Sequence, residues 1–179
     1  MCIRDSLKDY IRSIKDYPKK GILFRDITTL IKNETAFEES INQIVERSKK
    51  FKIDKIAAIE SRGFVFASAV SYILKKPFIM LRKKNKLPAD VHSVDFELEY
   101  GTATIEVHKD SISENDSVLI IDDLIATGGT AEAAAKLVEI SKGNIAAFIF
   151  VINLFDLGGC ENLLKKGYKV ENLMDFPGH

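Results

Sequence analysis

Residues 118–130 read Val-Leu-Ile-Ile-Asp-Asp-Leu-Ile-Ala-Thr-Gly-Gly-Thr, an apolar run followed by two acids and a turn of small residues. The apolar run is typical of a buried parallel strand. Residues 129–140 have apolar side chains at helical spacing, at Ala133, Leu137 and Ile140. In open α/β sheets, ligands bind in the crevice beyond the carboxyl ends of the strands. We therefore expect a strand–turn–helix unit whose turn contacts a ligand.

The turn has the chemistry of a phosphate-binding cradle. Gly128 and Gly129 let the backbone approach a ligand closely, and the helix that follows offers free N–H groups and a positive dipole end. Thr127 and Thr130 add hydroxyl donors beside the small Ala126. No lysine follows the glycines, so the turn is not a P-loop. The pattern predicts a site for a terminal phosphate.

Asp122 and Asp123 come directly before this cradle. Their carboxylates are placed to accept hydrogen bonds from the hydroxyls of a sugar that carries the phosphate. The alternative is a plain strand–turn–helix whose acids are solvated or cap the helix.

Elsewhere, expected strands alternate with expected helices, which predicts an α/β fold with a mostly parallel, twisted sheet covered by helices on both faces. The polar residues 83–95 are expected to form a long mobile loop, followed by a hairpin that turns at Gly101 and Thr102. The other expected helices are residues 7–15, a segment around 37–45, 63–74 and 157–166; the expected strands are 22–24, 55–59, 77–81, 117–121, 145–152 and 170–174.

The composition excludes several classes of protein. With 179 residues, 46% apolar and 29% charged, the chain is expected to form one compact cytoplasmic domain. Its 26 basic and 26 acidic residues cancel, which argues against a protein that coats nucleic acid. Cys2 and Cys160 lack metal-ligand spacing, and no apolar run suits a signal peptide or a membrane span. Residues 1–6 differ from the rest and are expected to be a non-native leader, with Ser6 as a helix N-cap.

The whole of residues 118–130 resembles the signature with which phosphoribosyltransferases bind 5-phosphoribosyl-1-pyrophosphate (PRPP). From about Tyr17 to His179, further stretches resemble the bacterial adenine phosphoribosyltransferases. Departures are mild: Asn85 stands where glycine is usual, but asparagine tolerates a left-handed backbone. Tyr17 and Lys20 stand where Phe and Pro are common. The resembling stretches are GILFRDI at 21–27, ESRGF at 60–64, RKKNKLP at 82–88, LEYG at 98–101, NLFDLGG at 153–159 and FPGH at 176–179.

This resemblance implies a type I phosphoribosyltransferase fold over residues 1–179, with a small base-binding hood at about residues 7–35 and a flexible catalytic loop at about residues 83–101. It implies that adenine and PRPP are converted to AMP and pyrophosphate in purine salvage. Mg²⁺ is the expected cofactor, carried mainly by PRPP and pyrophosphate without direct protein ligands. A homodimer is expected, and neither nucleic acid nor a membrane is an expected partner.

The leaving pyrophosphate carries much negative charge, which cations and backbone N–H groups should neutralise. The candidate cations are Arg62, Arg82, Lys83 and Lys86. The resemblance implies that some of the loop cations act across a dimer interface. It also implies a cis peptide between Glu60 and Ser61 that turns N–H groups toward the pyrophosphate. The alternative is that Arg62 is a surface arginine at a helix edge and that the loop cations are a solvated charge run.

Adenine donates at its 6-position and accepts at N1, whereas 6-oxopurines reverse both. A backbone C=O and N–H from one residue can therefore select adenine. The resemblance implies that Leu23 supplies this pair, Phe24 stacks on the base, Arg25 donates to N7 and Leu157 closes an apolar wall. The alternative for Phe24 is a place in the core.

Attack by adenine N9 requires the loss of its proton, and Glu99 is the candidate general base, with Tyr100 packing over the closed site. Alternatively, Glu99 faces solvent in a hairpin, and water or pyrophosphate takes the proton. Two other functions stay open: a regulatory PRPP sensor without catalysis, and a related enzyme that uses xanthine or another base. The complete motif from Arg82 to Tyr100, and the absence of a winged-helix segment, disfavour the sensor.

Overall fold

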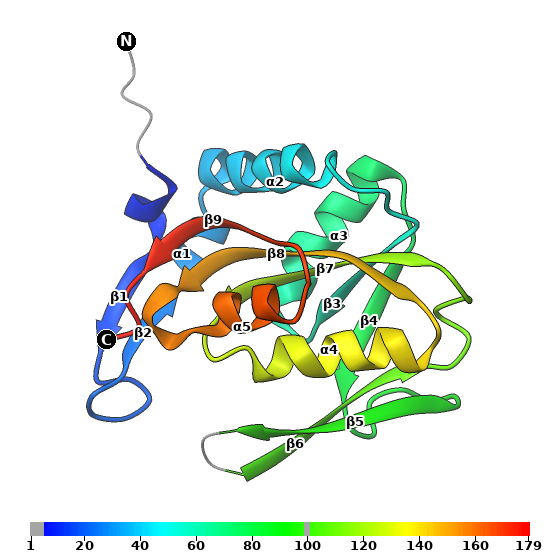
Figure 1. Ribbon diagram of the computed structural model, residues 1–179. Helices are drawn as coiled ribbons and strands as arrows, with labels where there is room; N and C mark the ends of the chain where they lie inside the picture. The colour runs from blue at the N-terminus through cyan, green and yellow to red at the C-terminus, as the bar shows by residue number, and fades with distance from the viewer. Residues whose placement is uncertain (1–5, 99–100) are drawn as a thin grey trace.

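The computed structural model describes residues 6–98 and 101–179, and its centre is a seven-stranded sheet (Figure 1). The strands are β3 (Lys55–Ile59), β4 (Phe78–Lys83), β5 (Val91–Leu98), β6 (Gly101–His108), β7 (Ser117–Ile125), β8 (Asn144–Leu154) and β9 (Val170–Phe176). Their order is β5-β6-β4-β3-β7-β8-β9. Five of these strands, β4, β3, β7, β8 and β9, are parallel to one another. At the β4 edge, β6 and then β5 add to the sheet in antiparallel pairing. The predicted fold class is confirmed.

Helices cover both faces of the sheet (Figure 1). One face packs against α2 (Glu34–Ser48) and α3 (Arg62–Leu74), and the other against α4 (Gly129–Ile140) and α5 (Gly159–Lys165). The helix predicted over residues 157–166 is interrupted, because Gly158 has a left-handed backbone between the 3-10 turn η2 (Phe155–Leu157) and α5. In the described part of the chain, no helix is long and apolar enough to cross a membrane.

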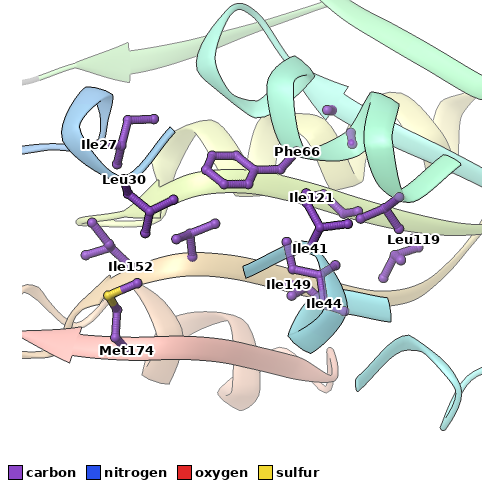
Figure 2. Close-up of a cluster of buried hydrophobic side chains, with 14 of the residues drawn as sticks. Ile27, Leu30, Ile41, Ile44, Phe66, Leu119, Ile121, Ile149, Ile152 and Met174 are labelled. Carbon is purple, nitrogen blue, oxygen red and sulfur yellow. The ribbon is translucent and has the colours of Figure 1, made fainter. Parts of the chain in front are cut away.

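Strand β7 is buried on both of its faces. Leu119 and Ile121 pack with Phe66 of α3 in one core cluster (Figure 2). Val118 and Ile120 lie in a second cluster, which includes buried side chains of α4. Burial on both faces explains why the strand is continuously apolar rather than alternating. Of the three residues that mark the apolar face of α4 in the sequence, Ala133 and Leu137 are buried, whereas Ile140, at the end of the helix, is exposed.

The N-terminal region forms a small lobe with its own two-stranded sheet. It comprises the 3-10 helix η1 (Leu7–Tyr10), β1 (Arg12–Lys15), β2 (Leu23–Asp26) and the short helix α1 (Thr28–Ile31). Ser6 caps η1, as predicted, by accepting a hydrogen bond from the Lys8 N–H. The helix predicted over residues 7–15 is wrong beyond Tyr10, because the chain extends there and Ile14 pairs with Phe24.

The prediction of a long loop over residues 83–95 is wrong for residues 91–95, which belong to β5. Only a short connection separates β4 from β5, and β5 pairs with β6 along its whole length. The segment looks like a loop in sequence because one face of β5 is polar and exposed, while Val94 and Phe96 pack into the core cluster of α4. The predicted turn at Gly101 and Thr102 is wrong, since both residues belong to β6, where Gly101 pairs with Leu98.

Candidate active site

A cavity of about 270 Å³ lies at the carboxyl ends of β3 and β7. Three segments that are distant in sequence meet there: Glu60–Arg62 after β3, the acids at the end of β7, and the turn that leads into α4. The predicted site residues that line it are Glu60, Ser61, Arg62, Asp122, Asp123, Ala126, Thr127, Gly128, Gly129 and Thr130. The remaining lining residues, Ile59, Leu124, Ile125, Ala131 and Phe150, were not singled out by sequence reasoning.

The turn before α4 is shaped by close backbone packing. Gly128 has a φ of +94°, a conformation that side chains disfavour. The Gly159 N–H donates to the Ala126 carbonyl over 3.0 Å, and a side-chain carbon on Gly159 would lie only 2.3 Å from that oxygen. The start of α5 therefore braces the turn from behind. The first N–H groups of α4 have no acceptor within the helix and are free for an anionic ligand.

The two acids and Arg62 form a connected charged group. Arg62 Nε lies 2.9 Å from Asp123 Oδ2, and the Asp123 N–H donates to Asp122 Oδ1 over 2.9 Å. Burial raises the pKa of Asp122, and the charge of Asp123 raises it further. Burial also raises the pKa of Asp123, although Arg62 acts in the opposite direction. A ligand that binds the carboxylates therefore meets a partly neutralised pair that is shielded from solvent, whereas the Arg62 side chain is half-exposed.

Glu60 links this cavity to the end of β4. Its Oε2 accepts hydrogen bonds from Arg82 Nε and from the Lys83 N–H, both over 3.0 Å. The implied cis peptide between Glu60 and Ser61 is present. The side chains of Lys83 and Lys86 are exposed and do not line the cavity described above. Of the predicted cations, Arg62 alone lines the cavity among the described residues.

The predicted base-binding residues lie in the N-terminal lobe, beside the cavity rather than in its lining. Phe24 is half-buried and belongs to neither core cluster, so it is not a core residue. Its ring and that of Tyr17 form a T-shaped pair with 5.1 Å between centroids, and the Arg62 guanidinium lies 5.8 Å from the centre of the Phe24 ring. Leu23, next to Phe24, is also half-buried.

Arg25 and Leu157 both contact the C-terminal segment, residues 176–179. Arg25 is buried, donates to Ser13 Oγ and to the Pro177 carbonyl, and lies over the Phe176 ring. Its Nε has no partner among the described residues. A side-chain carbon on Gly178 would lie 2.7 Å from Leu157 Cγ. Sequence reasoning noticed residues 176–179 as a motif but did not assign them to the site.

Glu99 and Tyr100 lie outside the described residues, so their predicted roles stay predictions. Strand β5, which precedes them, does reach the site. A side-chain carbon on Gly129 would lie 3.4 Å from the Glu97 carbonyl oxygen, so the end of β5 lies against the start of α4.

Known proteins match the chain over almost its full length. Residues 26–171 match the family model described as a phosphoribosyl transferase domain. The adenine phosphoribosyltransferase of Pelagibacter ubique is 86% identical over 174 residues, which are 97% of this chain and 99% of that protein.

Solved structures agree. Adenine phosphoribosyltransferase from Thermoanaerobacter pseudethanolicus has a TM-score of 0.91 at 45% identity, covering 95% of this chain and 98% of that one. The Saccharomyces cerevisiae enzyme, solved with an imino-altritol bisphosphate and adenine, has a TM-score of 0.86 at 35% identity, covering 94% and 96%. The chain belongs to the phosphoribosyltransferase family and, within it, to the adenine phosphoribosyltransferases.

Proposed function

We propose that this chain transfers the phosphoribosyl group of PRPP to adenine, forming AMP and pyrophosphate in purine salvage. The observation that carries the proposal is the single cavity shared by Asp122, Asp123, the turn at 126–130 and the segment Glu60–Arg62. It combines acceptors for sugar hydroxyls, donors for a phosphate and a cation for a leaving group. The 86% identity to an adenine phosphoribosyltransferase supports the same reaction.

In this proposal, PRPP binds along the cavity with its two phosphate groups at opposite ends. Its 5-phosphate binds the N–H groups and hydroxyls of residues 127–130, and its ribose hydroxyls donate to Asp122 and Asp123. Its pyrophosphate then faces Ser61 and Arg62, with Arg82, Lys83 and Lys86 as further cations. As adenine N9 forms its bond to the anomeric carbon, the bond to pyrophosphate breaks and its electron pair leaves with pyrophosphate. Cations near the departing oxygens stabilise that charge.

The donor set is compatible with the expected Mg²⁺. Among residues 6–98 and 101–179, no group of three or more metal-binding side chains lies together. Mg²⁺ is commonly bound largely by substrate phosphates and water, so in this proposal PRPP and pyrophosphate carry the ion, while Asp122 and Asp123 bind the neighbouring ribose. When bound with PRPP, the ion neutralises part of the charge on pyrophosphate.

Adenine binds, in this proposal, against the N-terminal lobe. The backbone of Leu23 pairs with the 6-amino group and N1, Phe24 stacks on the ring, and Leu157 closes the apolar side. The buried, unpartnered Nε of Arg25 supports a donor role toward N7, since a buried donor without an acceptor is costly. Glu99 is the proposed acceptor of the N9 proton.

The chain is further proposed to act as a homodimer in the cytoplasm, where phosphorylated sugars and nucleotides are made. An exposed apolar surface on α3 and β4 supports a second copy as partner. This apolar surface comprises Val65, Tyr72, Ile73 and Met80.

One assay tests the reaction directly. Purified protein is incubated with PRPP, Mg²⁺ and one purine base at a time, and the nucleotide and pyrophosphate formed are measured. Adenine should react, and chelation of Mg²⁺ should abolish the product. Equal rates with hypoxanthine or guanine would contradict the base assignment, and a faster rate with xanthine would favour the related enzyme. Catalysis with any base excludes a purely regulatory sensor.

A further inference from the structure

A tight turn after β4 carries two of the proposed pyrophosphate-binding cations. The Lys86 N–H donates to the Lys83 carbonyl over 3.3 Å, which closes a four-residue turn. Its third residue, Asn85, has a φ of +65°, whereas Lys84 does not have a positive φ. This is the pattern of a type II turn, which favours glycine or asparagine at its third position. The conformation of this turn therefore fixes the positions of the Lys83 and Lys86 Cα atoms, from which the two side chains extend.

A buried carboxylate holds this turn from below. Glu106 Oε2 accepts a hydrogen bond from the Asn85 N–H over 3.0 Å, and its Oε1 accepts one from Ser93 Oγ over 3.2 Å. Glu106 lies on β6 directly opposite Arg82 of β4 and Ser93 of β5. One side chain therefore connects the turn to all three antiparallel strands at this edge of the sheet.

The stability of the fold alone does not explain why a carboxylate is buried at position 106. Glu106 is 5% exposed, and none of the ion pairs between described residues includes it. A carboxylate that is buried without a cation loses its hydration, and here two neutral donors take the place of that hydration. An apolar residue would stabilise the strands at least as well. It could not accept the Asn85 N–H.

We propose that Glu106 is a positioning residue for the transfer reaction, which fixes the Lys83–Lys86 turn so that its cations meet the pyrophosphate of PRPP. The inference rests on the proposed function of these cations. Glu60 acts in the same way at the start of the turn, where it accepts the Lys83 N–H. Two carboxylates thus hold the backbone at Lys83 and Asn85, while both lysine side chains stay exposed to a ligand.

Two substitutions at Glu106 distinguish the effect of side-chain length from the effect of charge. Glu106→Gln keeps the length, an acceptor for the Asn85 N–H and a donor for Ser93 Oγ, whereas Glu106→Asp keeps the charge but is shorter by one methylene. Calorimetry should show a Kd for PRPP raised by about tenfold in Glu106→Asp, the scale of one lost charge-assisted hydrogen bond, and nearly unchanged in Glu106→Gln. The Kd for AMP, which has no pyrophosphate, should stay unchanged in both.

The matched pair Asn85→Ala and Asn85→Gly tests the turn from its exposed side, where folding is not at risk. Alanine disfavours a positive φ and should weaken PRPP binding alone, whereas glycine should bind like wild type. Parallel losses of PRPP and AMP affinity, or unchanged PRPP affinity in both Glu106→Asp and Asn85→Ala, would overturn the inference. A wild-type protein that forms no AMP would instead refute the proposed function, whatever the variants do.

Discussion

At the residue scale, Asp122 is a side chain whose ionisation destabilises the fold. Its pKa is raised above the ordinary value of 3.8 by burial and by Asp123. A carboxyl group with a raised folded-state pKa stabilises the fold fully below the unfolded-state pKa, and this stabilisation is lost as pH rises through the folded value. We therefore expect Asp122→Asn to raise the melting temperature at about pH 7.5 but not at about pH 4. Thermal unfolding of both proteins, followed by fluorescence at each pH, measures this difference. A lower melting temperature of Asp122→Asn at neutral pH would contradict this.

Substitution of Asp122 or Asp123 by alanine is expected to weaken ligand binding without unfolding the protein. Asp122→Ala and Asp123→Ala each remove charge-assisted hydrogen bonds to the ribose hydroxyls, worth roughly 1.5–3 kcal/mol apiece. Calorimetry should show weaker binding of both PRPP and AMP, because both ligands carry the ribose. Unchanged binding in both variants would exclude a ribose clamp, and a collapse of the melting temperature would favour a purely structural role.

Glu99 can be tested by its effect on the chemical step. Glu99→Gln keeps size and hydrogen bonding but removes basicity, so AMP formation in a single turnover should slow by at least about tenfold. PRPP affinity should stay nearly unchanged. Rapid-quench measurement on pre-bound PRPP is needed, because loop opening or product release often limits steady-state turnover. If Glu99→Gln forms AMP at the wild-type rate, water or pyrophosphate takes the N9 proton. If PRPP affinity and rate fall together, Glu99 organises the closed loop instead.

At the element scale, the contact of α3 with β7 places Arg62 beside the acids. A side-chain carbon on Gly63 would lie 2.7 Å from Asp122 Oδ1 and 3.1 Å from the Ile121 carbonyl oxygen. Gly63→Ala should therefore destabilise the fold by about 1–3 kcal/mol and weaken PRPP binding, since the helix start must move away from β7. Ser68→Ala, at an exposed position of the same helix, is the matched control. Equal melting temperatures and affinities in the two variants would refute this packing role.

Elements with a strong local pattern could be predicted from the sequence. The bounds of β3 and α4 agree with the prediction because an uninterrupted apolar run marks β3, whereas Gly128 and helical periodicity mark α4. Strand β1 and the first residues of β5 could not be predicted, since Ile14 and Val94 owe their conformation to strand pairing, whereas the antiparallel hairpin that begins at Phe96 was predicted. Apolar spacing at Leu7–Ile14 suits both a helix and a turn followed by a strand.

The candidate site divides in the same way. Asp122, Asp123 and the turn after them are contiguous, so one stretch of sequence carries their chemistry. The contacts of Arg25 with Ser13 and Pro177 join residues from both ends of the chain. Glu106 is opposite Arg82 only through strand register. No local pattern identifies such partners.

At the scale of the whole molecule, the apolar surface on α3 and β4 is the feature that a single copy leaves unexplained. Val65, Tyr72 and Ile73 recur at helical spacing on the outside of α3, and Tyr72 is 77% exposed. Met80 shares a face of β4 with Phe78, whose ring contacts Phe64 of α3 at 5.6 Å. An apolar patch that continues from a helix onto a neighbouring strand is typical of a subunit interface.

The dimer proposal therefore predicts that a charge in this surface separates the subunits. Ile73→Glu places a carboxylate in the interface, where its desolvation opposes association, so sedimentation velocity should show monomers where wild type forms dimers. Leu164→Glu, at an exposed leucine on α5, is the matched control and should stay dimeric. If loop cations act across the interface, Ile73→Glu should also lose AMP formation and weaken PRPP binding, with a melting curve that stays cooperative. A monomeric wild type that makes AMP would show that each chain is complete alone, and that the exposed side chains of α3 serve another purpose.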